Sequence, residues 1–444
     1  MKTPSTNSTA APSEAQIEDA LQYPGAVVRL GDCLEVLRAM PDNSMDSIVT
    51  DPPYGLSNVK PERITEAITA WATGDRERVP DGRGFMGKAW DSFVPPPAVW
   101  DECLRVLKPG GHLVAFAGSR THDLMGLSIR MAGFEIRDGL AWLYGTGFPK
   151  SMDVSKAIDK SVGAERGTKE VPFAGSAYSA NAGNWRPWMD EASKTGVRSV
   201  ANDTPATPEA EQWQGWGTAL KPAFEPVTLA RKPLEGTVAA NVLKWGTGAL
   251  NIDGCRIGDE ALPAHTRDTK MGTFLGADGN VTPERTGRWP ANVALDEHQA
   301  AALDEQSGNR PSRGGAAFDR GGYGGTVGLN RTDRRELGYG DMGGASRFFY
   351  CAKASAKERP EVDGVKHPTV KPLALMRWLV RLTTPPGGTV FDPFAGSGTT
   401  IEAAMLEGFD AVGVEMEPSY LPLIERRLER ATTGSSAPTG EVIH

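Results

Sequence analysis

The sequence predicts an α/β protein whose strands form a parallel sheet. Two stretches of the chain alternate short apolar strands with helices of amphipathic spacing, the order typical of a parallel sheet. Between them lie long segments rich in glycine, proline, serine and asparagine, which are interpreted as insertions. The first half begins on a strand, and the second half closes on strand, helix, strand, helix. We therefore expect one α/β domain whose two halves are separated in sequence and complete a single sheet.

The individual elements follow from the spacing of apolar residues. Runs of adjacent apolar residues place strands at 26–30, 46–50, 112–117, 225–233 and 292–295. Apolar residues recurring every three or four positions place helices at 33–40 and 98–107, and another helix closes at Gly133 before a further strand. After 367 the chain continues as helix, strand, helix, strand and helix.

The expected domain boundaries divide the chain into seven parts. The two halves of the α/β domain are 25–155 and 347–431, and the segment 223–255 returns to it. The insertions are 156–222 and 256–346. Tails rich in small polar residues, expected to be disordered, are 1–24 and 432–444.

Composition excludes several classes of protein. No run approaches the roughly 18 apolar residues of a membrane-spanning helix, and no signal peptide is apparent, so a cytoplasmic protein is expected. The 4 cysteines include no C-x-x-C pair, which argues against a disulfide framework or a zinc site. The formal net charge of -8 argues weakly against a nucleic-acid partner, but arginines concentrate between 285 and 347 and can supply a basic segment.

The segment TVFDPFAGSGTTIEAA, residues 389–404, joins a strand to a helix through a glycine-rich turn. Glycines let a ligand approach the backbone, and a helix N-terminus offers free N–H donors. A plain turn between strand and helix is the alternative, since many such turns contain Gly-x-Gly. Glu415, at the end of the next strand, favours a cofactor site because an acid there can accept hydrogen bonds from the ribose of an adenosine-containing cofactor.

The segment DSIVTDPPYG, residues 46–55, carries polar groups at the carboxyl end of a strand, where open α/β sheets place their sites. Asp51 supplies a carboxylate and Pro52 a carbonyl, and Pro52 and Pro53 fix the backbone that holds these acceptors. Two acceptors suit an exocyclic amino group, and Tyr54 offers a flat face on which the ring bearing it can stack. A β-turn with a structural tyrosine is the alternative interpretation.

DPPY followed by DPFAGSGTT resembles the β-class DNA amino-methyltransferases that use S-adenosylmethionine, a group that includes phage and restriction-modification enzymes. GDCLEVLRAMPDNSMDSIVTDPPYG, RVLKPGGHLVAFAG and KHPTVKPLALMRWLV are similar to further segments of that family. The resemblance covers 26–150, 223–255 and 347–430. It implies a Rossmann-like, mostly parallel sheet with one antiparallel strand, circularly permuted, with an inserted target-recognition region.

The resemblance also implies a set of cofactor-binding residues. The glycine loop would line the methionine part of S-adenosylmethionine with Asp392, Pro393, Phe394, Ala395, Gly396, Ser397, Gly398, Thr399 and Thr400. Glu415 would hold the ribose, and Asp32 would lie near the adenine unless it only caps a helix. The segment that closes over the methionine end would contain His367, Thr369 and Lys371, although His367 and Lys371 can also cap the following helix.

The implied activity is methyl transfer from S-adenosylmethionine to the N6 amino group of adenine in double-stranded DNA, after the base has been flipped out of the stack. The catalytic residues would be Asp51, Pro52, Pro53 and Tyr54. Asp in the first position favours adenine, because enzymes acting on cytosine N4 more often have Ser there. Neither a metal ion nor a covalent enzyme intermediate is required.

Several alternatives stay open. The first is methylation of cytosine N4, which presents the same two N–H donors. The second is methylation of RNA or protein, but enzymes of that kind usually have Asn before the two prolines, where this chain has Asp51. The third is a non-catalytic DNA-binding relative, which would be expected to have lost Asp51, Tyr54 or the glycine loop, all of which are present. A homodimer is compatible with the sequence. The sequence does not reveal the recognition sequence, the oligomeric state or an accompanying restriction enzyme.

The two insertions are the candidates for target recognition, since base edges are commonly read by Arg, Asn and Gln. The second insertion contains Arg310, Arg313, Asn330, Arg331, Arg334 and Arg335. For any one of these arginines a solvated loop is the simpler alternative. The first insertion contains four tryptophans that can contact DNA or form the core of a small subdomain: Trp185, Trp188, Trp213 and Trp216.

Overall fold

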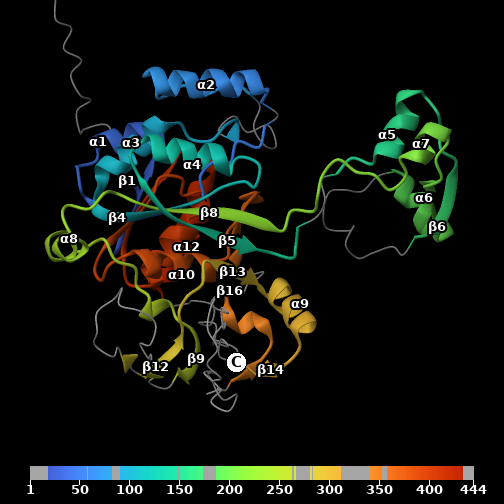
Figure 1. Ribbon diagram of the computed structural model, residues 1–444. Coiled ribbons are helices and arrows are strands. Elements are labelled where there is room, and N and C mark those ends of the chain that lie inside the picture. Colours follow the sequence, from blue (N-terminus) through green and yellow to red (C-terminus); the bar gives the residue numbers. More distant parts are fainter. Residues whose placement is uncertain are drawn as a thin grey trace, which may run out of the picture. The chain divides into compact units, whose positions relative to one another are not determined.

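The computed structural model (Figure 1) describes residues 19–57, 59–82, 91–147, 151–173, 187–262, 265–266, 281–282, 284–311, 341–352 and 358–433. The chain forms two compact units. The first unit combines Met1–Gly145 with Phe224–His444, and the second is Thr146–Ala223. The first unit therefore contains the predicted half 347–431 and most of the predicted half 25–155, whose last residues, 146–155, belong to the second unit.

A ten-stranded sheet forms the centre of the first unit. In spatial order its strands are β1 (Asp19–Tyr23), β2 (Ala26–Leu30), β20 (Asp410–Glu415), β19 (Thr389–Asp392), β3 (Met45–Thr50), β4 (Leu107–Phe116), β8 (Phe224–Arg231), β5 (Glu135–Leu143), β13 (Val293–Asp296) and β16 (Tyr350–Ala352). The strands from β2 to β4 are parallel, and β8 lies antiparallel between β4 and β5. The predicted α/β class with a mostly parallel sheet is confirmed.

Helices cover both faces of this sheet (Figure 1). One face packs against α1 (Cys33–Ala39), α3 (Pro97–Val106) and α4 (His122–Met131), and the other against α10 (Leu373–Thr383), α11 (Thr399–Leu406) and α12 (Leu421–Thr432). On β3, Ile48 packs on the face covered by α1, α3 and α4, and Val49 packs on the face covered by α10, α11 and α12. Both residues are fully buried. A strand covered on both sides has no polar face, which explains why Ile48 and Val49 stand next to each other in the sequence.

The first unit contains further elements outside the central sheet and the helices that cover it. The helices are α2 (Pro61–Thr73), α8 (Val238–Trp245) and α9 (Glu297–Ser307), with 3-10 turns η4 (Asp253–Cys255), η5 (Ala345–Phe348) and η7 (Pro418–Tyr420). Two-stranded sheets pair β9 (Ile257–Leu262) with β12 (Arg285–Arg288), β10 (His265–Thr266) with β11 (Val281–Thr282), β14 (Arg310–Pro311) with β15 (Met342–Gly343), and β17 (Glu361–Val362) with β18 (Val365–Lys366).

The N-terminal edge of the sheet corrects the expectation of a disordered tail over 1–24. Asp19–Tyr23 forms β1, which pairs antiparallel with β2. The hairpin turn is made by Pro24 and Gly25, and Gly25 has a φ of +78°, so this proline-glycine pair supplies the geometry that a tight turn requires. The sheet consequently contains two antiparallel strands, β1 and β8, rather than one. The ends 1–18 and 434–444 lie outside the described residues.

Two further expectations differ from the structure. The segment 256–346 is not wholly an insertion, because β13 lies in the central sheet, parallel to both β5 and β16. Its residues Ala294 and Leu295 are buried, so this short apolar run has the burial of a sheet strand. The strand expected at 112–117 begins earlier, at Leu107, because the Pro-Gly-Gly sequence is accommodated within β4 with Gly110 at a φ of +82°.

The second unit is small and has its own sheet. It consists of β6 (Thr168–Pro172) paired with β7 (Val197–Ala201) and of α5 (Val154–Ser161), α6 (Pro187–Thr195) and α7 (Pro208–Gln212). A buried ion pair, in which Arg166 Nε donates to Asp159 Oδ2 at 2.6 Å, joins its parts. Trp213 and Trp216 pack edge to face but are 41% and 61% exposed, so they do not form a core. Trp188 lies in α6, and Trp185 lies outside the described residues.

Candidate active site

The DPPY turn and the glycine loop lie side by side although they are far apart in sequence. They follow β3 and β19, which are adjacent parallel strands with Ile48 opposite Phe391. The Thr50 hydroxyl, at the end of β3, donates to Asp392 Oδ1 at 2.7 Å across a sequence separation of 342. Both loops therefore leave the same carboxyl edge of the sheet, where open α/β sheets form their sites.

The DPPY turn is held rigidly by two residues that the sequence did not indicate. The buried carboxylate of Asp91 accepts the backbone N–H groups of Tyr54 and Gly55 at 2.8 and 3.0 Å. The Thr121 hydroxyl donates to the Tyr54 carbonyl at 2.6 Å. Gly55 has a φ of +64°, and a Cβ there would lie 2.7 Å from the carbonyl carbon of Phe93, so this position accepts only glycine without rearrangement.

Four side chains meet beyond this edge and form the Asp51 cluster: Asp51, Tyr54, Glu225 and Lys371. The Tyr54 hydroxyl lies 2.7 Å from Asp51 Oδ1 and 3.2 Å from Glu225 Oε2. Lys371 Nζ donates to Asp51 Oδ2 at 2.8 Å and lies 3.2 Å from Glu225 Oε2. Two carboxylates thus share one ammonium group and one hydroxyl.

The charge state of the Asp51 cluster follows from burial and from these contacts. Burial alone would lower the pKa of Lys371, but the carboxylates of Asp51 and Glu225 outweigh it and the pKa is raised. Burial, reinforced by the same two carboxylates, raises the pKa of Tyr54 well above its usual value. At neutral pH Lys371 is therefore an ammonium ion and Tyr54 a neutral phenol. Lys371 Nζ also lies 5.2 Å from the centre of the Tyr54 ring, a cation–π contact.

The glycine loop brings bare backbone close to its neighbours. Gly396 and Gly398 have φ values of +55° and +80°. A Cβ at Gly396 would lie 3.1 Å from His367 Nε2, and one at Gly398 would lie 2.9 Å from Ile424 Cγ2. Gly398 precedes α11, whose first turn is not capped by a side chain. Accessible backbone beside an uncapped helix start fits a cofactor that approaches the main chain closely.

Two buried acids fasten this loop to the sheet. Glu415 Oε2 accepts the Gly396 N–H at 2.7 Å, and Glu415 Oε1 accepts the Glu417 N–H at 2.8 Å. Burial nevertheless raises the pKa of Glu415 to about 7. Burial also raises the pKa of Asp392 to about 6, although Asp392 accepts hydrogen bonds from Thr50 and from the Phe394 N–H. Both acids therefore titrate close to neutral pH.

His367 lies next to Gly396 of the glycine loop, and Thr369 contacts the His367 ring. His367 Nδ1 contacts the Thr369 carbonyl, and the imidazole packs edge to face on Tyr420 with ring centroids 4.7 Å apart. Burial lowers the pKa of His367, so its ring is neutral at neutral pH. The remaining loop residues are buried except for Phe394: Pro393, Ala395, Ser397, Thr399 and Thr400. The cofactor roles of all these residues stay predictions.

Asp32 reaches the same edge from β2. Leu30, two residues earlier, pairs with Glu415 in the sheet. The Asp32 carboxylate accepts the N–H groups of Leu34 and Glu35 at 2.9 and 3.3 Å and caps α1. The helix-capping interpretation is therefore confirmed, whereas contact with the adenine of a cofactor stays a prediction.

Glu225 is the member of the Asp51 cluster that the sequence analysis missed. It lies near the start of β8, which runs antiparallel to its neighbours. The beginning of an antiparallel strand meets the same edge as the carboxyl ends of parallel strands. An acid at the start of the strand predicted at 225–233 was therefore a usable signal once that strand was recognised as the antiparallel one.

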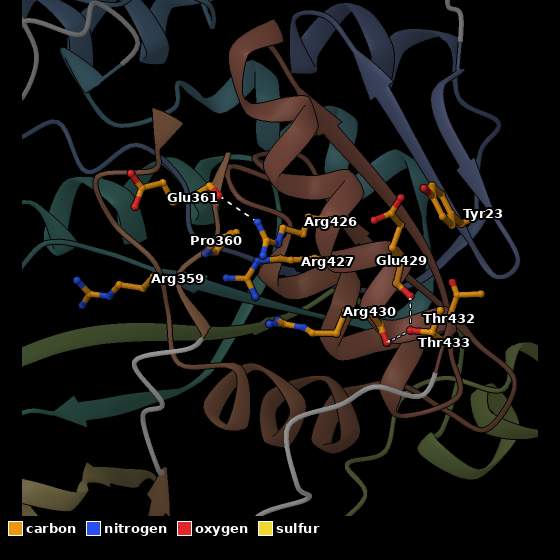
Figure 2. Close-up of a pocket in the computed structure, with 10 residues that line it drawn as sticks. All are labelled: Tyr23, Arg359, Pro360, Glu361, Arg426, Arg427, Glu429, Arg430, Thr432 and Thr433. Carbon is orange, nitrogen blue, oxygen red and sulfur yellow. Dashed lines mark hydrogen bonds between the residues drawn. The ribbon is translucent and has the colours of Figure 1, made fainter. Parts of the chain in front are cut away.

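A pocket of about 830 Å³ lies elsewhere in the first unit (Figure 2). It is lined by Tyr23, Arg359, Pro360, Glu361, Arg426, Arg427, Glu429, Arg430, Thr432 and Thr433. Figure 2 shows Arg426, Arg427 and Arg430 projecting from α12. No predicted site residue lines this pocket, so it is separate from the candidate active site. Two of the lining arginines, Arg427 and Arg430, are paired with Glu402.

The arginines of the basic segment 285–347 have different surroundings. Arg288 and Arg347 both donate to Asp341, and their side chains are only 8% and 15% exposed, so these two stabilise the fold. Arg310 is exposed, and its carbonyl accepts a hydrogen bond from Arg347 Nη2 at 3.1 Å. The other candidates for base recognition lie outside the described residues: Arg313, Asn330, Arg331, Arg334 and Arg335.

A DPPY turn held beside a glycine loop on one edge of a mostly parallel sheet is the arrangement expected of an amino-methyltransferase. The chain belongs to the N6/N4 DNA methylase family, since the model of that family, described as DNA methylase, matches residues 45–426. The matched range includes both loops and all four members of the Asp51 cluster.

Curated relatives align with shorter segments of the chain. The DNA adenine methyltransferase YhdJ of Escherichia coli is 38% identical over 76 residues, which cover 17% of this chain and 26% of the relative. The type II methyltransferase M.ScaI of Streptomyces caespitosus is 36% identical over 75 residues, 17% of this chain and 25% of the relative. These alignments thus span about a quarter of each relative.

Solved structures resemble the chain over most of its length at low identity. The PvuII DNA methyltransferase, cytosine-N4-specific, has a TM-score of 0.42 and 15% identity, and the match covers 94% of each chain. A DNA modification methylase from Thermus thermophilus, complexed with S-adenosyl-L-methionine, has a TM-score of 0.35 and 18% identity over 91% of this chain and 95% of that chain.

Among the helices in the described parts of this chain, none combines the length and apolar character needed to cross a membrane.

Proposed function

We propose that the chain transfers a methyl group from S-adenosylmethionine to the N6 amino group of adenine in double-stranded DNA. The observation that carries the proposal is the Asp51 carboxylate, fixed next to the glycine loop in a member of the DNA methylase family. Adenine is favoured over cytosine by the Asp of the DPPY turn and by the adenine methyltransferase named among the relatives.

The target base has to leave the duplex before its amino group can meet the cofactor, and flipping costs a few kcal/mol. Stacking on the Tyr54 ring would return about 1–3 kcal/mol. Asp51 and the Pro52 carbonyl would accept the two amino N–H groups. Asp51 already accepts from Tyr54 and Lys371, but a carboxylate has about four lone-pair sites, so it can also accept an amino hydrogen.

The cofactor would supply an electrophilic methyl group when bound. Glu415 would accept the ribose hydroxyls, and the backbone of Gly396 and Gly398 would receive the methionine part, with His367 covering it. Asp91 and Thr121 fix the DPPY turn, so the acceptors need no reorganisation when the base arrives.

The amino nitrogen is a poor nucleophile because its lone pair is conjugated with the ring. Hydrogen bonds to Asp51 and to the Pro52 carbonyl would favour a pyramidal nitrogen whose lone pair points away from both acceptors. A nitrogen held in this orientation reacts as if at a high effective concentration, which accounts for several kcal/mol of barrier lowering.

The test is transfer of a tritium-labelled methyl group to mixed-sequence duplex DNA, followed by nucleoside analysis. Wild-type protein is expected to produce N6-methyladenine, and Asp51→Ala to lower the rate at least about 100-fold. Asp123→Ala, an exposed acid in the first turn of α4, is the matched control and should behave as wild type. N4-methylcytosine would keep the mechanism and change the base, and methylation of RNA or protein alone would refute the proposal.

A further inference from the structure

Methylation of an amino group releases a proton, which needs an acceptor. The inference rests on the proposed function. When the amino nitrogen forms its bond to the methyl carbon, one of its N–H bonds has to break, and the proton passes to a base. Asp51 is the first acceptor because it would hold that N–H group. A base and cofactor lying over Asp51 would separate its carboxylate from water, so a second acceptor is needed.

Lys371 cannot be this second acceptor. Its Nζ lies 2.8 Å from Asp51 Oδ2 and 3.2 Å from Glu225 Oε2, and an ammonium ion in this position has no free lone pair. Glu225, in contrast, is a carboxylate whose side chain is 22% exposed, so it has contact with solvent.

The Tyr54 hydroxyl connects the two carboxylates. Its oxygen lies 2.7 Å from Asp51 Oδ1 and 3.2 Å from Glu225 Oε2. A phenol has one proton and can donate it to only one of these oxygens at a time, but its lone pairs can accept from the other. When the hydroxyl donates to Glu225, a lone pair of the phenol oxygen is free to face Asp51 Oδ1.

We propose that Tyr54 and Glu225 form a proton relay that carries the released amino proton from Asp51 to solvent. The amino proton passes to Asp51 Oδ1. The protonated Asp51 then gives its proton to the Tyr54 oxygen while the Tyr54 O–H proton passes to Glu225 Oε2. Tyr54 ends as a neutral phenol, Asp51 ends as a carboxylate, and Glu225 carries the proton until water removes it.

The groups around the relay favour this direction. Lys371 Nζ is closer to Asp51 than to Glu225, so its positive charge attracts the Asp51 carboxylate more strongly than the Glu225 carboxylate. Tyr144, near the same carboxylate, is raised in pKa by burial and by Glu225 and remains a neutral phenol. The Phe116 ring, 5.1 Å from Lys371 Nζ, is not titratable. Glu225 acts through Tyr54 and is a positioning residue that does not touch the base.

The experiment measures single-turnover methyl transfer by the full chain for four proteins: wild type, Tyr54→Phe, Glu225→Gln and the double variant. Phe keeps the ring for stacking and removes only the hydroxyl. Each single variant is expected to slow transfer by about 10- to 100-fold, with unchanged dissociation constants for S-adenosylmethionine and DNA. The double variant should be no slower than the slower single variant, because both substitutions interrupt one route.

Two further measurements distinguish a proton relay from a purely structural role of Glu225. Added formate should restore part of the rate of Glu225→Ala, since a small carboxylate can take the place of the lost one, whereas a misfolded site would not respond. Glu235→Gln, an exposed acid after the other end of β8 that pairs with Lys244, is the matched control and should keep the wild-type rate.

The outcomes separate the relay from the proposed function. A wild-type rate in Tyr54→Phe, or single effects that multiply in the double variant, would overturn the relay while leaving methyl transfer established. Absence of methyl transfer to any DNA by the wild-type protein would overturn both.

Discussion

Two clusters of charged side chains in the first unit pair their carboxylates in different ways. The Glu402 cluster consists of Glu402, Arg427 and Arg430, between α11 and α12. Glu402 is fully buried and accepts from Arg427 Nη1 at 2.5 Å and from Arg430 Nε at 2.7 Å. One carboxylate there has two guanidinium partners, so it remains paired if either arginine moves away.

The Asp51 cluster has the opposite balance, with two carboxylates for one ammonium ion and one hydroxyl proton. Lys371 contacts both carboxylates, but the single Tyr54 hydroxyl proton can be donated to only one of them at a time. The two carboxylate side chains are about a fifth exposed, 21% and 22%. A cluster with more donors than acceptors is fixed, whereas a cluster with too few donors can rearrange when a substrate adds one. The helix α11 connects the glycine loop to the Glu402 cluster, because it begins at that loop and carries Glu402.

The largest expected effect lies in the Glu402 cluster. Glu402→Gln leaves the buried guanidinium of Arg427 without a counter-charge and also removes the partner of Arg430, whose side chain is 24% exposed. Breaking a buried pair in this way lowers the free energy of unfolding by about 3–5 kcal/mol. Urea denaturation measures the loss. Glu425→Gln, an exposed acid on α12, is the control and should change stability by less than about 0.5 kcal/mol. Equal stability of the two variants would remove the contrast between the clusters.

Removing the cation of the Asp51 cluster should have a smaller effect on stability. Lys371→Met leaves the carboxylates of Asp51 and Glu225 unpaired, but both have contact with water, so a loss of about 1–3 kcal/mol is expected. The same urea titration measures it, with Lys366→Met as control because Lys366 is exposed and pairs only at the surface with Glu361. A loss larger than that of Glu402→Gln would show that the Asp51 cluster is the more rigid of the two.

Glu415 makes stability and cofactor binding depend on pH. Its pKa of about 7 in the folded protein exceeds the unfolded value of about 4.3, so its contribution to stability is complete below pH 4 and falls as pH rises to 7. The ionised form is the better acceptor for ribose hydroxyls, so affinity for S-adenosylmethionine should rise up to about 10-fold per unit as pH approaches 7 from below.

Calorimetric titration with S-adenosylmethionine at several pH values between 5.5 and 8.5 measures this dependence. Glu415→Gln carries no titrating group and should bind more weakly with a flatter pH profile. Identical profiles for the wild type and the variant would exclude Glu415 as the group that links cofactor binding to pH.

The smallest expected effect concerns the contact between the glycine loop and α12. Gly398→Ala combines a strained φ of +80° with a Cβ only 2.9 Å from Ile424. Gly408→Ala has nearly the same φ, +79°, but no atom within 4 Å of its Cβ among the described residues. Thermal unfolding should show a loss of about 1 kcal/mol for Gly408→Ala, from strain alone, and roughly 1 kcal/mol more for Gly398→Ala, from the clash. Equal losses of stability in the two variants would mean that α12 shifts at Ile424 and relieves the clash.

Much of the fold was predictable because its signals are local. Apolar spacing located β2, β3 and β8 to within a residue or two, and the turn residues located the glycine loop. The first antiparallel strand was missed because a five-residue strand in a polar segment, Asp19–Tyr23, gives little periodic signal.

The site was predictable only in part, because its chemistry depends on contacts across the chain. Asp51 and Tyr54 were identified from one short motif. Glu225 meets Tyr54 across a sequence separation of 171, and Lys371 meets Asp51 across 320, so neither contact could be predicted from local patterns without the order of the strands in the sheet. Lys371 was expected at the methionine end of a cofactor, and the structure adds its ion pair with the DPPY turn.

The pairing of β3 with β19 has a consequence for how the protein is made. Thr50 and Asp392 are 342 residues apart, and a ribosome adds about 5–20 residues per second, so roughly 20 to 70 seconds separate their synthesis. During that interval β3 can pair with β4, but its other edge has no neighbour and is open to wrong partners. The DPPY turn therefore remains without its glycine loop until almost all of the chain has been translated, and the candidate active site cannot be assembled before then.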